Sequence, residues 1–371
     1  MGVQDAYKLQ NKLFFYLITI VFVYSIFVII DKNSIVGFIY IFSCFIFFVL
    51  GYMPHKKLAY KKQEITYSFK KYSQFFLYLF LFVGTYINIY AATYNTENFN
   101  EFVIQLITST NEGVNLRESY ELSSEQGGIS GLLKILGGLN LAVTYIYYFI
   151  WINDRSSKNR KHFLIAILFL VIRLLFTLEL TTAFVIMYML VSYAILSNKK
   201  RVLIILITLI YLSADIVAYS RIGKSCLYLL DSYFTLGFDN FIILIESYKN
   251  YNFGISTILN PLAFVFQYLD IPIVYSSYEW EINPAQNLFG DTFLNFRYFG
   301  VIEFFIYGII IKMLKNSLIR NVSYSHFSPY IMVFAITILV VPNFKGIDFW
   351  FLFISSVIFK KIFIEKTNNI R

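Results

Sequence analysis

Apolar runs of helix length recur along almost the whole chain, and they constrain its fold more than any motif. The runs lie near residues 13–30, 35–53, 74–93, 130–152, 162–178, 181–197, 202–219, 293–314, 329–344 and 347–364. About 20 apolar residues in a helix cross a bilayer. A mean hydropathy of +0.63 is also too high for a soluble domain. The sequence therefore predicts an all-α, polytopic integral membrane protein, with residues 1–371 forming a single transmembrane domain of about ten helices.

Lysine and arginine are distributed unevenly between the loops, and this distribution predicts the orientation of the chain. With the N-terminus inside, ten spans place the following segments in the cytoplasm: 54–73, 153–161, 198–201, 315–328 and the C-terminus. These segments hold most of the 31 lysines and arginines. Because short cytoplasmic loops are enriched in these residues, we expect a multi-pass protein of the bacterial cytoplasmic (inner) membrane with both termini in the cytoplasm. The net charge of +9 is then a topology signal and predicts no nucleic-acid partner.

Two outer segments are long. The first, 94–128, is an acidic loop with six glutamates. The second, 220–292, contains apolar runs at 226–245 and 258–269, and the shorter of these contains Asn260-Pro261 and is too short to span. We expect interfacial helices here, lying on or dipping into the outer leaflet. If 226–245 spanned instead, 258–269 would have to return and the number of spans would be twelve.

The inner loop 54–73 is strongly basic, and the rest of the chain lacks the usual signatures of cofactor sites. Its lysines predict contact with anionic lipid heads, so membrane lipids are expected partners. The two cysteines, Cys44 and Cys226, are far apart in sequence and predict no disulfide framework. Glycine-rich phosphate loops, HExxH motifs and cysteine–histidine clusters are missing from the sequence. We therefore expect no metal and no cofactor.

Three arginines are expected in or beside the outer half of the membrane: Arg173, Arg221 and Arg297. Arg297 lies inside the apolar run 293–314, where a cation costs at least roughly 2.5–3.5 kcal/mol, which makes it a candidate functional residue. Guanidinium groups form bidentate bonds to phosphate oxygens. Together with Lys224, the three arginines predict a site for a lipid diphosphate. A structural ion pair is the alternative for Arg173.

Asp291 is the first candidate for contacting a sugar hydroxyl. It is either a base or the N-cap of a helix that begins near Thr292, because aspartate is a preferred N-cap. On a straight helix Asp291, Asn295 and Tyr298 share one stripe, whereas Arg297 is turned away from it.

The loop before this helix offers a second set of candidates. Glu281 is an alternative base. Trp280, beside it, either stacks on a sugar or lies at the membrane interface.

The segment 284–300 resembles the late outer-loop-to-helix signature of bacterial O-antigen and capsule repeat-unit polymerases. The matching residues are Pro284, Gly290-Asp291, Leu294-Asn295-Phe296 and Gly300. The resemblance covers fewer than thirty residues and is supported by many spans and a large late outer loop. The chain departs from the pattern at two positions, with Asp291 in place of the commoner glutamate and Arg297 where glycine is frequent.

The resemblance implies a metal-independent, GT-C-like glycosyltransferase acting on undecaprenyl-diphosphate-linked oligosaccharides at the outer face of the membrane. A hydroxyl of one repeat unit attacks the anomeric carbon of the growing chain, and the lipid diphosphate leaves. Arg173, Arg221 and Arg297 would stabilise the leaving group, and Asp291 or Glu281 would orient or deprotonate the hydroxyl. Asn295, Tyr298 and Trp280 would contact the glycan. A chain-length regulator protein is a further implied partner.

Two other functions fit the same sequence. An O-antigen ligase would move the glycan to a different acceptor. A flippase or transporter would carry the same lipid-linked sugar across the membrane, although such proteins commonly have internal repeats and paired broken helices, and no repeat is evident here.

Overall fold

The computed structural model describes residues 3–53, 65–93, 136–177, 180–197, 224–247, 287–319 and 347–368, together with Ile338 and single residues of 204–219. The chain forms two compact units. The first unit comprises Met1–Ala6, Lys62–Leu229 and Phe351–Arg371, and the second comprises Tyr7–Lys61 and Leu230–Trp350. Each unit therefore combines early and late parts of the chain.

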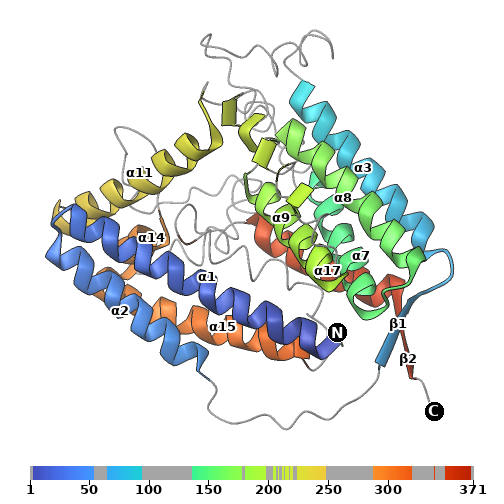
Figure 1. Ribbon diagram of the computed structural model, residues 1–371, viewed down its shortest axis with the longest axis horizontal. Helices are drawn as coiled ribbons and strands as arrows, with labels where there is room; N and C mark the ends of the chain where they lie inside the picture. The colour runs from blue at the N-terminus through green and yellow to red at the C-terminus, as the bar shows by residue number, and fades with distance from the viewer. Residues whose placement is uncertain are drawn as a thin grey trace, which may run out of the picture. The chain divides into compact units, whose positions relative to one another are not determined.

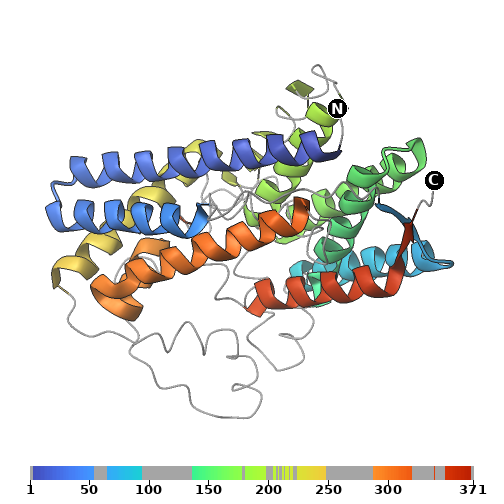
Figure 2. The same ribbon diagram turned by 90° about the horizontal axis from the view of Figure 1, so that it is seen from below.

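The second unit is built on three long helices that run side by side, α1 (Val3–Asp31), α2 (Ile35–Tyr52) and α15 (Val301–Ile319) (Figures 1 and 2). A tight turn joins α1 to α2. Asn33 adopts a left-handed conformation there (φ 57°), and the Ser34 side chain caps α2 by accepting from the Gly37 amide. At this end of the unit lie α11 (Cys226–Ser247), which belongs to it from Leu230 onward, and α14 (Leu288–Phe296).

Glycines bring α2 and α15 close together. A Cβ at Gly308 would lie 2.4 Å from the Phe48 carbonyl oxygen, and a Cβ at Gly51 would lie 2.2 Å from the Phe305 carbonyl oxygen. Small residues allow membrane helices to approach at backbone distance, where dispersion contacts are dense. Aromatic packing continues this interface toward α14 and α1. Phe304 stacks on Phe289 of α14 with ring centroids 5.3 Å apart and meets Phe22 of α1 edge-on at 6.1 Å.

The first unit surrounds α7 (Leu139–Asn153), whose residues from Leu139 to Ile152 are all buried except Leu141. It packs against α3 (Ser73–Thr93) and α8 (Ser157–Thr177), and α8 in turn contacts α9 (Leu180–Leu196). The helix α17 (Ile347–Phe363) continues into a strand of this unit.

A two-stranded antiparallel sheet, which the sequence did not predict, joins β1 (Ile65–Phe69) to β2 (Ile364–Asn368). The register pairs Ile65 with Asn368 and Phe69 with Ile364. The strands come from two segments that the charge distribution assigned to one side of the membrane. The described fold is thus mostly helical, as predicted for an all-α membrane protein, with one short two-stranded ribbon added.

Four segments of the described residues are long and apolar enough to cross a membrane. They are Phe14–Asp31, Ile35–Tyr52, Ser73–Ala91 and Leu288–Met313. Helices also occupy the predicted spans that correspond to α7, α8, α9 and α17, whereas the runs near 202–219 and 329–344 lie largely outside the described residues. The chain is therefore a helical membrane protein, and the number of about ten spans stays a prediction.

Candidate functional site

The helix α14 begins earlier than the sequence predicted, and its cap is Asn287. The Asn287 side chain accepts from the Gly290 amide at 2.8 Å, and its Nδ2 donates to the Gly237 carbonyl of α11 at 2.9 Å. The interpretation of Asp291 as the N-cap is therefore wrong, because the helix starts at Leu288 and Asp291 lies in its first turn. A carboxylate in the first turn interacts favourably with the helix dipole.

Asp291 belongs to a buried polar cluster formed by α14 and α15. The Asn295 Nδ2 donates to the Asp291 carbonyl at 2.9 Å and lies 3.4 Å from its carboxylate, as the predicted i, i+4 spacing requires. One turn into α15, Glu303 is buried and accepts at Oε2 from the Tyr307 hydroxyl at 2.8 Å. Tyr307 also lies within electrostatic range of the Asp291 carboxyl. One buried carboxyl group, Glu303, thus binds this phenol, and a second, Asp291, lies in the same cluster.

A close contact with α2 completes the cluster. The Tyr40 hydroxyl is 2.9 Å from the Thr292 hydroxyl, and both groups are buried. Gly300 packs directly over this pair, because a Cβ there would lie 2.4 Å from both the Thr292 carbonyl oxygen and the Tyr40 hydroxyl. Gly300 is therefore needed for α14 to fold back against the start of α15.

A break separates α14 from α15 at the 3-10 turn η2 (Arg297–Gly300). The sequence predicted one continuous helix there. Arg297 has φ 55° and ψ −133°, a conformation that glycine adopts freely and that costs other residues of order 1–3 kcal/mol. Its side chain is exposed, with the guanidinium 5.9 Å from the centre of the Tyr298 ring. Tyr298 is itself exposed beyond the break, so it does not share the buried stripe of Asp291 and Asn295.

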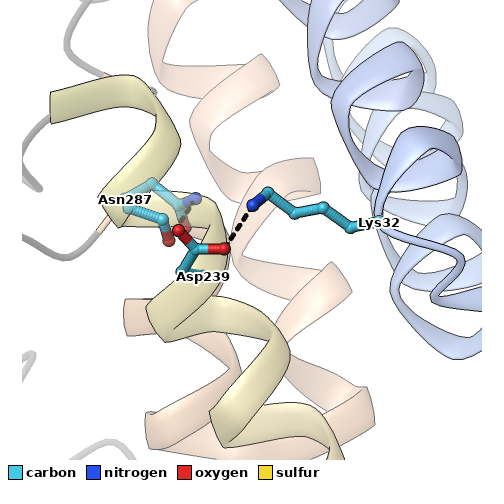
Figure 3. Close-up of polar contacts among 4 residues, drawn as sticks. Lys32, Asp239 and Asn287 are labelled. Carbon is cyan, nitrogen blue, oxygen red and sulfur yellow. Dashed lines mark hydrogen bonds and ion pairs between the residues drawn. The ribbon is translucent and has the colours of Figure 1, made fainter. Parts of the chain in front are cut away.

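The helix α11 is held against this site at the end of the α1–α2 hairpin. Lys32 forms an ion pair with Asp239, and the Ser34 hydroxyl donates to Glu246 at 3.3 Å. Figure 3 shows Lys32 reaching from the hairpin to Asp239 on α11, close to Asn287 at the start of α14. Predicted outer segments therefore lie together at one end of the second unit.

Arg173, in the first unit, takes part in helix packing. Its Nη1 donates to the Gly137 carbonyl at 2.6 Å and to Asn140 Oδ1 at 3.1 Å. Asn88 of α3 donates to the same carbonyl at 3.0 Å, so α3, α7 and α8 meet at this point. These bonds give Arg173 a structural role at the start of α7, and its structural ion pair stays a prediction.

The remaining predicted site residues belong to the first unit or lie outside the described residues. Lys224 is exposed just before α11, with its ammonium 3.8 Å from the centre of the Tyr228 ring. Arg221, Glu281 and Trp280 lie outside the described residues. Arg173 lies in the first unit and Arg297 in the second, and the three-arginine cluster stays a prediction.

Sequence reasoning missed Glu303, Tyr307 and Tyr40. The criterion that singled out Arg297, an ionisable residue inside an apolar run, applies equally to Glu303. The i, i+4 spacing of Glu303 and Tyr307 would then have predicted their bond. Tyr40 carries no such signal, because it contacts this site only through the packing of α2 on α14.

Comparisons with protein-family models, with curated proteins and with solved structures find no match for this chain.

Proposed function

We propose that the second unit carries the site of a membrane glycosyltransferase that joins lipid-diphosphate-linked oligosaccharides at the outer face of a bacterial inner membrane. The observation that carries this proposal is the placement of a strained, exposed arginine at a helix break between Asp291 and Glu303, the two buried carboxyl groups of the cluster. The polymerase-like signature covers Asp291 and the break.

The backbone at Arg297 supports a functional role for its side chain. Glycine is frequent at this position in the signature, and the conformation at Arg297 is one that favours glycine. An arginine that occupies it at a cost of order 1–3 kcal/mol is retained for its side chain, because backbone strain concentrates at functional sites. We assign the guanidinium to the diphosphate of the leaving group.

The buried acids would handle the proton. The acceptor hydroxyl oxygen forms a bond to the anomeric carbon, the bond from that carbon to the diphosphate oxygen breaks, and the electron pair leaves with the diphosphate. Asp291 takes the hydroxyl proton, while Asn295 fixes the Asp291 carboxylate by its hydrogen bond. Glu303 and Tyr307, which bond to each other on α15, add a second buried carboxyl group to the same cluster.

The assay supplies purified protein with lipid-linked repeat units in the absence of nucleotide sugars, and a ladder of longer lipid-linked glycans supports the polymerase. Arg297→Gly is the decisive variant, because it removes the charge and relieves the backbone strain. We expect it to fold at least as stably as wild type and to make no ladder. Arg297→Ala and Arg221→Ala should also lose the ladder at normal expression. Phe299→Ala, at an exposed neighbouring residue, is the matched control.

Full activity in Arg297→Gly, or in both alanine variants, would remove the diphosphate role. Transfer of glycan to a different acceptor, with no ladder, would identify a ligase.

The helix break favours one second candidate, a transporter of the same lipid-linked sugar. Transporters bind substrates at discontinuous helices whose interrupted backbone lines the site, and η2 interrupts such a helix here. In proteoliposomes, labelled lipid-linked sugar that crosses the bilayer with no ladder would favour transport over polymerisation.

A further inference from the structure

A cavity in the first unit lies between the ribbon and the α7–α8 turn. Its volume is about 480 Å³, and its lining includes β1 from Tyr67, the turn that leads from β1 into α3, and the first turn of α8. The segments that form it, 54–73 and 153–161, were both assigned to the cytoplasmic side by their charge. The cavity is separate from the candidate site of the second unit.

Three lysines line this cavity: Lys70, Lys71 and Lys158. The last turn of α17 holds Lys70 in place, because the Lys70 Nζ donates to the Lys361 carbonyl at 3.0 Å. Asp154 is the single acid among the described residues of the lining, and its oxygens accept from the Asn159 side chain at 2.8 Å and the Ser156 amide at 3.2 Å. The cavity therefore combines a positive charge excess with an acid that is already bonded to its own turn.

The turn from β1 into α3 presents an aromatic ring beside these lysines. Tyr72 adopts a left-handed conformation (φ 65°), which is unusual for a bulky residue, and its ring is 68% exposed. Lys71 lies over this ring at 4.9 Å. Tyrosine is enriched where a membrane span meets the headgroup layer, and α3 is one of the four helices apolar enough to span.

The start of α3 also exposes apolar side chains next to the cavity. Phe75 and Phe76 are 67% and 45% exposed, one turn after Tyr72. A phospholipid would place its phosphate at the lysines and its acyl chains along these rings, so it would cover both the charged and the apolar surface. A soluble phosphate compound would cover only the charged one. In Figure 1 the turn after β1 leads directly into α3.

We propose that this cavity is a binding site for the headgroup of an anionic phospholipid, with the phosphodiester held by Lys70, Lys71 and Lys158 and the acyl chains lying along the first turns of α3. The site fixes the ribbon and the ends of α3, α7 and α8 at the membrane surface. It requires neither glycosyl transfer nor transport.

The test is native mass spectrometry of the full chain in detergent, titrated with phosphatidylglycerol, phosphatidylcholine or free glycerol phosphate. The variant Lys71→Gln/Lys158→Gln removes two lining charges. The matched control is Lys161→Gln/Lys361→Gln, which removes two exposed charges from α8 and α17 that do not line the cavity. We expect wild type to retain phosphatidylglycerol over phosphatidylcholine. In the lining variant we expect the affinity for phosphatidylglycerol to fall about fivefold for each lysine removed, or roughly 30-fold for both, because each lysine near an anionic membrane contributes a similar attraction.

Three outcomes would overturn the proposal. Equal weakening in the lining variant and the matched control would reduce the effect to general surface charge. Equal retention of the two lipids would show that the headgroup charge is not read. Binding of glycerol phosphate as tight as that of phosphatidylglycerol would assign the cavity to a soluble phosphate compound. Thermal unfolding of both variants in detergent confirms that each one folds.

Discussion

Replacing Gly308 by alanine tests the close packing of α2 and α15. The new Cβ would lie 2.4 Å from the Phe48 carbonyl oxygen, 2.9 Å from the Tyr52 nitrogen and 3.1 Å from the Gly51 carbonyl carbon. All three neighbours are backbone atoms, so no side-chain rotation relieves the overlap. A carbon–oxygen contact is normally about 3.3–3.6 Å, so the helices must separate by about 1 Å.

Separation costs free energy in two ways. Overpacking of this kind destabilises proteins by about 1–3 kcal/mol, and a gap of 0.5–1 Å elsewhere along the interface forfeits about a quarter to a half of each dispersion contact. We therefore expect Gly308→Ala to lower the free energy of unfolding by about 1–3 kcal/mol, which is a factor of roughly 5 to 150 in the folded-to-unfolded ratio.

The control is Gly37→Ala, also in a helix of the second unit. A Cβ there would meet the Ser34 Oγ at 3.0 Å and the Ile29 side chain at 3.4 Å, which are side-chain atoms that can move. Alanine also gains up to about 1 kcal/mol of helix propensity over glycine. The measurement is the loss of helical circular dichroism as a denaturing detergent is added to mixed micelles. If both variants unfold at the same detergent fraction as wild type, the backbone contact between α2 and α15 does not exist.

Three further predictions concern the caps and the charges. Asn287→Ala should lower the free energy of unfolding by roughly 2–4 kcal/mol, because it removes a helix cap and leaves the buried Gly237 carbonyl without this donor. Asn287→Ser, measured in the same unfolding assay, should recover only the part of this free energy that comes from the helix cap. A double-mutant cycle of Lys32→Met and Asp239→Asn should give a coupling of about 0.2–1 kcal/mol that shrinks in high salt, because both groups are partly exposed; a coupling that ignores salt would contradict this pairing. Burial and the neighbouring Asp215 carboxylate raise the pKa of the Cys226 thiol. In a Cys44→Ser background, the rate at which maleimide labels Cys226 should therefore keep rising about tenfold per pH unit above the pH at which an ordinary thiol is fully ionised. A plateau near pH 8.5 would refute the raised pKa.

The sequence predicted the helices better than it predicted the candidate site. Apolar runs predicted α1, α2 and α3 because a membrane span is encoded in consecutive residues. The i, i+4 spacing likewise predicted that Asn295 and Asp291 share one face of the helix, where the structure shows a hydrogen bond between them. These features depend on local sequence alone.

Features that depend on distant residues were not predicted. The Asn287 side chain that caps α14 also binds Gly237 of α11, 50 positions earlier in the chain. The break at Arg297 lies where Gly300 packs against Tyr40, a residue 260 positions earlier. Strands β1 and β2 also pair across about 300 positions of sequence. A straight-helix projection of the segment around Arg297 therefore placed Tyr298 on the wrong face.

The β1–β2 ribbon also has a consequence for how the protein is made. Strand β2 is synthesised about 300 residues after β1, and at about 5–20 residues per second this takes roughly 15–60 s. During that interval β1 stands beside the membrane with its edge groups unpaired, next to a span that has already been inserted. The order of translation thus leaves the first unit unfinished until β2 emerges, and a stop codon shortly before Ile364 would yield a chain whose helices insert but whose first unit does not close.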